Sequence, residues 1–164
     1  MPNVVALLLV TSLLSVTGKP AALPTVQQFF VGCTKGRGIL KVMVSRARSV
    51  TVASVGYLEP DGTLVVAQTV SQEAKAETHR EWRLREVGPD RFTGTLSTAS
   101  GPVTGQTYRD GLHLTFRMKG GMIADQQLTL AADGLSVVNV MTVRKFGIVV
   151  GRLLENIERC PAVG

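Results

Sequence analysis

The residue with the clearest capacity for chemistry is Arg80, which alternates with Trp82 and Leu84 along strand-like sequence. Side chains two positions apart in a strand share a face, so an inward Trp82 would bring Arg80 inside as well. An interior guanidinium needs a carboxylate, several hydrogen-bond acceptors or an anionic ligand. Arg80 could therefore bind the acidic head of a lipid. The alternatives are a position at a rim or an internal network with Asn139.

A second polar position, Asn139, shares a strand face with Val137 and Met141. Buried amides are hydrogen-bonded, so Asn139 either braces the interior or contacts the same ligand. Trp82 is either a core residue or a platform for that ligand. The predicted ligand-binding residues are Arg80, Trp82, Leu114, Phe116, Val137 and Asn139.

Residue types that serve catalysis or bind metals are scattered along the chain. His79 and His113 lie opposite the apolar faces of their strands, and no third ligand stands at a spacing suited to zinc. The sequence has no Gly-x-Ser-x-Gly motif, no Cys/His nucleophile pair and no phosphate-binding glycine loop before a helix. We therefore expect no catalytic residues, no metal, no cofactor and no enzymatic activity.

Short alternating runs separated by turns position these residues. Leu112, Leu114, Phe116 and Met118 alternate with polar residues, and Asp-Gly turns follow at 61–62, 110–111 and 133–134. This pattern predicts one all-β domain over residues 28–160, an antiparallel up-and-down barrel of about 8–10 strands. Residues 26–30 could form a short helical turn that covers one end. Residues 152–159 fit either a strand or an amphipathic helix.

The chain ends indicate export. Residues 1–18 carry no charged side chain, and their apolar stretch is followed by small residues, as in a cleaved signal peptide. An uncleaved anchor is the alternative, and residues 19–27 are predicted to be a linker. The expected location is the periplasm or the outside of the cell. Lipoprotein anchoring is not expected, because the first cysteine, Cys33, lies well beyond the apolar stretch.

Cys33 and Cys160 bracket most of the predicted domain. An even pair in an exported protein favours a disulfide, with two free thiols as the alternative. A bridge suits a barrel whose first and last strands pair. The net charge of +6 favours anionic surfaces such as membranes. Nucleic acid is not expected, because basic and acidic residues are mixed.

Several motifs, taken together in order, resemble one bacterial family. They are Phe29-Phe30-Val31-Gly32 with Gly36-Arg37-Gly38, Arg80-Glu81-Trp82, Gly101 with Gly105, residues 125–130, Ala132-Asp133-Gly134, Asn139 and residues 145–151. The family they resemble is a lipocalin-like domain of unknown function in Gram-negative envelope proteins, often lipoproteins. The resemblance implies a lipocalin-like barrel in the bacterial envelope.

These observations predict an exported barrel that binds or carries a small hydrophobic or anionic lipid, of the fatty-acid or phospholipid class. The alternative is a structural or interaction module whose interior is filled by its own side chains. The oligomeric state is left open. An apolar cavity of a few hundred Å³ would favour the binding protein, and a solid interior around Trp82 would favour the module.

Overall fold

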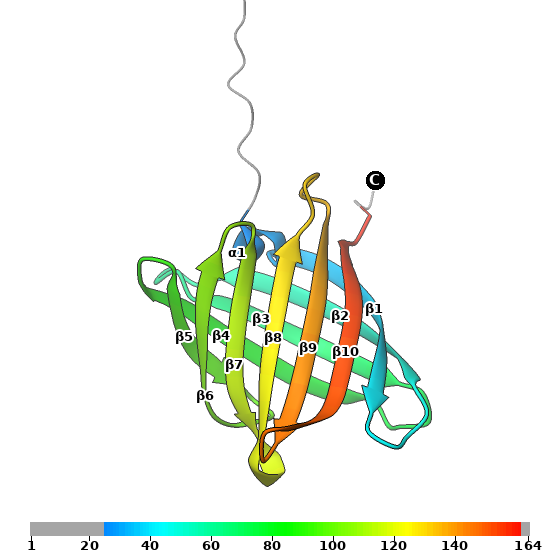
Figure 1. The fold of residues 1–164 in the computed structure, drawn as a ribbon. Coiled ribbons are helices and arrows are strands. Elements are labelled where there is room, and N and C mark those ends of the chain that lie inside the picture. The colour runs from blue at the N-terminus through cyan, green and yellow to red at the C-terminus, as the bar shows by residue number, and fades with distance from the viewer. Residues whose placement is uncertain (1–24, 162–164) are drawn as a thin grey trace, which may run out of the picture.

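The computed structural model describes residues 25–161, and the predicted signal peptide and residues 19–24 of the predicted linker lie outside the described residues. Ten strands form a closed antiparallel barrel in which each strand pairs with its neighbours in sequence and β1 pairs with β10 (Figure 1). Within the described residues, no helix is long and apolar enough to cross a membrane. The elements are α1 (Val26–Phe29), β1 (Gly32–Val42), β2 (Arg48–Leu58), β3 (Leu64–Gln72), β4 (Thr78–Gly88), β5 (Arg91–Leu96), β6 (Ala99–Tyr108), β7 (Gly111–Met118), η1 (Lys119–Gly121), β8 (Met122–Leu130), β9 (Ser136–Lys145) and β10 (Ile148–Arg159).

The all-β barrel confirms the predicted fold class, with ten strands at the top of the expected range. The alternation that predicted it is clearest in β7, where Leu112, Leu114 and Phe116 are at most 3% exposed and His113 and Arg117 point outward. Residues 152–159, which fitted a strand or a helix, form a strand that pairs with both β9 and β1. Hydrogen bonds to both neighbouring strands pair the backbone N–H and C=O groups of this segment, so it is a strand and not a helix.

The short helix α1 closes one end of the barrel (Figure 1). Thr25 and Gln28 form a reciprocal capping box that starts the helix, and Phe29 and Phe30 are 0% and 7% exposed. Residues 26–30 thus cover one barrel end as predicted, and we call this end the α1 end. The predicted linker over residues 19–27 runs into this helix, because α1 begins at Val26.

The opposite end, where β1, β3, β5, β7 and β9 finish, is less tightly closed, and we call it the open end. Inward-facing side chains near it are only partly buried: Leu40, Val70, Met118, Met122 and Met141. Toward the α1 end the interior is packed with apolar side chains, among which Trp82 and Phe116 meet edge to face with ring centroids 5.3 Å apart.

The predicted disulfide between Cys33 and Cys160 is confirmed. It joins the beginning of β1 to the residue after β10, where the first and last strands close the barrel. The Cα atoms are 5.3 Å apart, and the backbone N–H of Cys160 donates to the carbonyl oxygen of Cys33 at 3.0 Å. The bridge therefore lies beside the β1–β10 ladder and secures the first strand to the last at the α1 end.

Candidate functional site

A band of polar side chains crosses the barrel interior at mid-height. On adjacent strands, Arg80 lies opposite Gln68, Gln68 opposite Ser54, and Ser54 opposite Thr34. On β9 and β10, Asn139 lies opposite Glu155. We call these six inward-facing residues the polar band: Thr34, Ser54, Gln68, Arg80, Asn139 and Glu155.

Gln68 organises one side of the polar band. Its Oε1 atom accepts from Arg80 Nε at 2.7 Å and from the indole Nε1 of Trp82 at 2.9 Å. Its Nε2 atom donates to Ser54 Oγ at 3.1 Å. The Arg80 guanidinium also lies 5.9 Å from the Trp82 ring centroid. Among the described residues, the two terminal nitrogens of Arg80 have no hydrogen-bond partner, so they are free to donate to a ligand.

Glu155 dominates the other side of the polar band and is 3% exposed. Its Oε2 atom accepts a hydrogen bond from Asn139 Nδ2 at 2.8 Å. Its side chain lies over Gly36 and Gly38 of β1, where an added Cβ at Gly36 would overlap the carboxylate and one at Gly38 would come within 2.9 Å of Glu155 Cβ. The two glycines therefore provide the space that the buried glutamate occupies.

Three buried oxygens of the polar band have no hydrogen-bond partner among the described residues: Thr34 Oγ1, Asn139 Oδ1 and Glu155 Oε1. Such groups are rare in folded proteins, because each one loses its hydrogen bonds to water without replacement. They mark a place where a group that donates hydrogen bonds would be stabilised.

Arg80 and Glu155 influence one another electrostatically across the interior. Burial raises the pKa of the Glu155 carboxyl, and the Asn139 hydrogen bond and the Arg80 charge oppose that rise. Burial lowers the pKa of Arg80, and Glu155 opposes it. Within the described structure their charged atoms form no ion pair of 4.0 Å or less. An incompletely paired acid and base thus share one interior.

The predicted site residues all face inward. The hydrogen-bond network between Arg80 and Asn139, which the sequence offered as one alternative to ligand binding, does not form. Arg80 bonds to Gln68, and Asn139 bonds to Glu155 instead. The four predicted wall residues belong to the packed core: Trp82 at 5%, Leu114 at 2%, Phe116 at 3% and Val137 at 0% exposed. The interior is therefore solid around Trp82, which is the result expected of a barrel filled by its own side chains, and it is less tightly filled between the polar band and the open end.

Sequence reasoning missed Glu155 and Gln68. Glu155 lies in the segment that fitted a helix or a strand, and only the strand places it inward between Leu153 and Ile157. Gln68 lies between Val66 and Val70 on β3, and the same alternation could have identified it. In both cases the signal was a polar residue at an inward position of an apolar alternating run.

A pocket of about 300 Å³ lies at the mouth of the open end. Its lining combines inward residues of β1–β3 with loop residues: Leu40, Val42, Ser45, Arg46, Arg48, Gln72 and Lys75. Along β3 the inward side chains Gln72, Val70 and Gln68 are all partly exposed, and of these Gln72 lines the pocket. This volume is at the lower end of the range for small-molecule sites.

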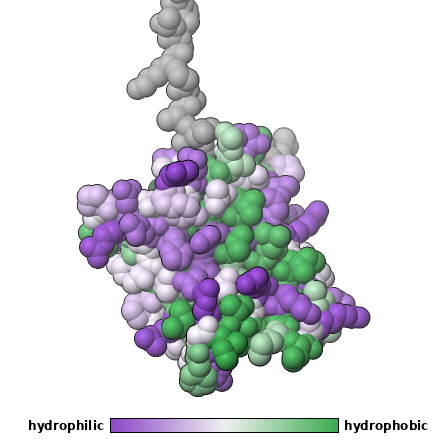
Figure 2. Space-filling view, viewed as in Figure 1, coloured by the Kyte–Doolittle hydropathy of each residue, from purple (hydrophilic) through white to green (hydrophobic). Residues whose placement is uncertain are grey.

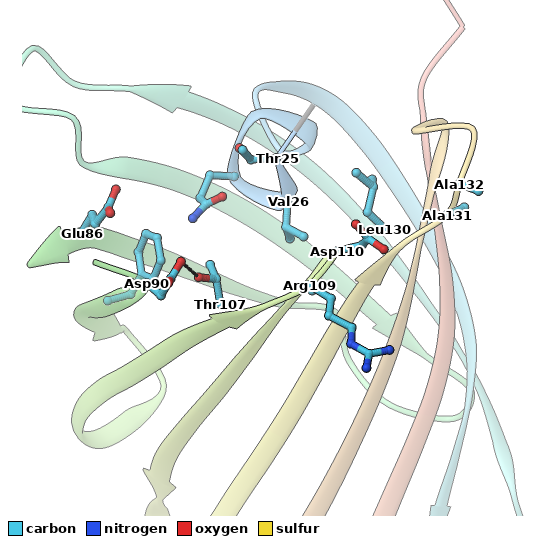
Figure 3. A pocket seen from close by; sticks show the side chains of 13 residues that line it. Thr25, Val26, Glu86, Asp90, Thr107, Arg109, Asp110, Leu130, Ala131 and Ala132 are labelled. Atoms are coloured by element: carbon cyan, nitrogen blue, oxygen red, sulfur yellow. Dashed lines mark hydrogen bonds between the residues drawn. The ribbon is translucent and has the colours of Figure 1, made fainter. Parts of the chain in front are cut away.

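A larger groove of about 470 Å³ lies at the α1 end, between α1 and the turns around Asp90, Arg109 and Ala131 (Figure 3). Its floor is apolar, and Asp90 is held by a hydrogen bond from Thr107 at 2.5 Å. None of the unpartnered buried oxygens of the described residues lies in it. The polar band is therefore the stronger candidate site.

Comparison with known proteins places this barrel in a family. Residues 18–159 match the model of a family described as protein of unknown function (DUF3833). The chain belongs to this family. The predicted resemblance to a domain of unknown function is thereby confirmed, and no curated protein is found as a relative of the DUF3833 chain.

The fold of the DUF3833 chain is similar to that of an S-type phycobiliprotein lyase, CPES from Guillardia theta, with a TM-score of 0.69 and 8% identity over 84% of this chain and 92% of that one. It is also similar to a redesigned β-barrel, mFAP1 bound to DFHBI, with a TM-score of 0.46 and 10% identity over 83% of this chain and all of that one.

The similarity to the lyase corrects one prediction. We expected no enzymatic activity because the sequence lacks a nucleophile motif, a phosphate-binding glycine loop and a third ligand at a spacing suited to zinc. A protein described as a lyase has the same fold, so the absence of those motifs does not exclude an enzyme, and the expectation is wrong. Fold alone does not assign an activity to this chain.

Proposed function

We propose that the barrel binds one small amphipathic acid of the fatty-acid or phospholipid class, with its head in the polar band and its chain directed toward the open end. The observation that carries this proposal is the set of unpartnered buried oxygens in the same interior as the free terminal nitrogens of Arg80, whose charge acts on Glu155. A carboxyl head group offers an acceptor to Arg80 and, when protonated, a donor to Glu155 or Asn139.

The polar band can bind an acidic ligand only if the carboxyl group of the ligand and that of Glu155 share one proton. A ligand carboxylate and an ionised Glu155 would together place two negative charges beside the single positive charge of Arg80. One proton held between the two carboxyl groups makes the buried cluster neutral, which burial favours. The raised pKa of Glu155 supports this arrangement. Binding should therefore take up a proton and weaken as the pH rises.

Apolar contacts for the chain would come from both sides of the polar band. Trp82 and Phe116 would form the floor on the α1 side. Between the band and the open end, the partly buried Met118, Met122 and Met141 would line the chain, since methionine adapts readily to an apolar partner. Leu114 and Val137 could touch a ligand only if the core opened, so their place in the wall stays a prediction.

The disulfide supports a location outside the cytoplasm, because such bridges persist in oxidising compartments. We therefore propose that the protein works in the bacterial periplasm or outside the cell. Attachment to the envelope as a lipoprotein is not part of the proposal, because Cys33 is held in the bridge.

Calorimetric titration of delipidated protein with dodecanoate and with dodecanol tests the proposal. We expect the acid to bind more tightly than the alcohol. Arg80→Ala should weaken dodecanoate binding about 10-fold or more, the effect of losing a charged hydrogen bond of roughly 1.5–3 kcal/mol. Arg48→Ala tests the mouth pocket as a rival site for the head group. Arg117→Ala is the matched control, because Arg117 points outward from β7, and it should change affinity by less than about threefold.

Three results would overturn the proposal. Equal affinity for acid and alcohol would remove the role of the head group, and a greater loss with Arg48→Ala than with Arg80→Ala would move the head to the mouth. No binding of either probe, together with no lipid in native mass spectra of protein from its own host, would favour the alternative of a barrel filled by its own side chains.

A further inference from the structure

The hairpin tips of the open end project apolar side chains into solvent. Val44 in the β1–β2 turn is 103% exposed, and Phe146 in the β9–β10 turn is 89% exposed. Met43 and Ile148 beside them are 51% and 61% exposed. The backbone N–H of Met43 donates to the carbonyl oxygen of Val150 on β10, so the two tips are neighbours and form one patch.

The backbone at both tips is unfavourable for the residues it carries. Val44 has a φ of 51° and Phe146 a φ of 50°, in the left-handed region. Phe146 and Gly147 form a two-residue turn, since Lys145 pairs with Ile148. Such turns favour Asn or Gly at the position of Phe146, and the left-handed conformation costs other residues about 1–2 kcal/mol. Fold stability therefore does not explain these two apolar side chains.

Basic residues surround the apolar tips. The charged loop and strand-end residues of the open end are Lys41, Arg46, Arg48, Lys75, Lys119 and Lys145, against the acidic Glu73 and Glu77. The loop and strand-end residues of the α1 end have the opposite balance, with acidic Glu59, Asp61, Asp90, Asp110, Asp133 and Glu158 against basic Arg91, Arg109 and Arg159. The barrel is thus electrically polar along its axis, with its positive end at the open mouth.

Apolar and polar residues meet on the face that Figure 2 shows, with hydrophobic side chains gathered toward the open end and hydrophilic ones among them. Lys145 illustrates the pairing at atomic scale, since its Nζ lies 5.7 Å from the Phe146 ring centroid. Protruding apolar side chains flanked by lysine and arginine are the combination that binds the interface of an anionic bilayer.

We propose that the open end docks on a lipid bilayer with anionic head groups, with Val44 and Phe146 inserted among the head groups and the basic residues around them facing lipid phosphates. A bilayer suits side chains that project from convex tips, whereas a protein partner needs a broad, closely complementary surface. Each lysine or arginine near such a surface contributes roughly 1 kcal/mol at physiological ionic strength. Docking would place the mouth pocket against the membrane, and it does not depend on whether the interior binds a lipid.

Co-sedimentation with vesicles tests this inference. The protein should bind vesicles of phosphatidylcholine mixed with phosphatidylglycerol, bind those of phosphatidylcholine alone at least about 10-fold more weakly, and dissociate as salt is added. Phe146→Asn and Val44→Asn should each weaken binding about fivefold or more, the effect of losing one buried apolar side chain of roughly 1.5–3 kcal/mol with partial insertion. Both variants should melt at the same temperature as the wild type or higher, because Asn accepts the left-handed conformation.

Leu135→Asn is the matched control. Leu135 is 65% exposed but lies in the β8–β9 turn of the α1 end, so the same loss of an apolar side chain there should leave vesicle binding unchanged. In Phe146→Trp, the new indole fluorescence should shift to the blue on vesicle addition and be quenched by brominated lipid. Adsorption by charge alone would give neither signal.

The inference fails if the Asn variants bind as the wild type does, if Leu135→Asn is equally impaired, or if the new tryptophan is not quenched. It also fails if the protein does not bind vesicles and Phe146→Asn converts a dimer to a monomer. That result would show that the tips contact a second copy of the chain. Dodecanoate titration of the same variants distinguishes a failure of docking from a failure of the proposed ligand binding.

Discussion

Removal of the Cys33–Cys160 disulfide has a stability effect that can be worked from the structure. The bridge closes a loop of 127 residues in sequence separation. In the chain-entropy model, closing a loop of that length lowers the conformational entropy of the unfolded chain. This loss stabilises the folded state by about 5 kcal/mol at 25 °C. Measured effects usually fall below this limit, so we expect a loss of about 3–5 kcal/mol in the free energy of unfolding.

The native fold should form without the disulfide, because the hydrogen-bond ladder between β1 and β10 is complete beside it. β1 and β10 pair from Thr34 and Arg159 to Val42 and Gly151 without the disulfide. The effect therefore belongs to the unfolded state. The double variant Cys33→Ser/Cys160→Ser should keep the circular dichroism spectrum of the wild type and melt about 10–20 °C lower, at roughly 3–5 °C per kcal/mol for a domain of this size.

Urea unfolding followed by circular dichroism is the assay, with reduced wild-type protein as the control. Reduced wild type and the double variant should coincide, and both should show a larger dependence on urea than the oxidised protein, because an open unfolded chain exposes more surface. A stability loss below about 1 kcal/mol would refute the entropic reasoning. A changed native spectrum would show that the bridge, and not the ladder, holds β1 against β10.

Two further predictions concern the polar band. Gly36→Ala should destabilise the fold by about 1–3 kcal/mol in urea titration, because the added methyl group overlaps the Glu155 carboxylate. Combining it with Glu155→Ala should recover part of this loss. If the losses of the two single variants simply add in the double variant, this explanation is wrong. Since burial raises the pKa of Glu155 in the folded state, its contribution is fully favourable below the unfolded value near 4.5 and is lost as pH rises through the raised pKa. Glu155→Gln should remove this decline of stability as the pH rises above about 4.5, and an unchanged pH profile would assign the decline to another group.

Much of the fold could be predicted because its determinants are local. The alternation in β7 and the Asp-Gly turns required only neighbouring residues, and the apolar run around Phe29 already indicated a cover for one barrel end. The Cys33–Cys160 pairing followed from the closure of an up-and-down barrel, in which the first and last strands must meet.

The partners inside the polar band could not be predicted because they depend on how the strands are staggered around the barrel. Alternation places Arg80 and Asn139 inward but does not set their relative heights, which follow from the register of all ten strands. The identity of residues 152–159 as strand was hidden for a related reason. Pairing with β1, more than a hundred residues away in sequence, decides it, and without it Glu155 has no defined direction.

The polar band and the tips of the open end both carry residues that are less favourable for fold stability than other residues would be at the same positions. Apolar residues in place of Glu155 and Asn139 would avoid two of the three unpartnered oxygens, and Asn in place of Phe146 would relax a strained turn. The disulfide and the ladder between β1 and β10 supply stability that can offset such features. Departures from locally favourable chemistry concentrate at functional sites in natural proteins. On that basis we expect function at the polar band and at the tips of the open end, and the packed α1 side supports both.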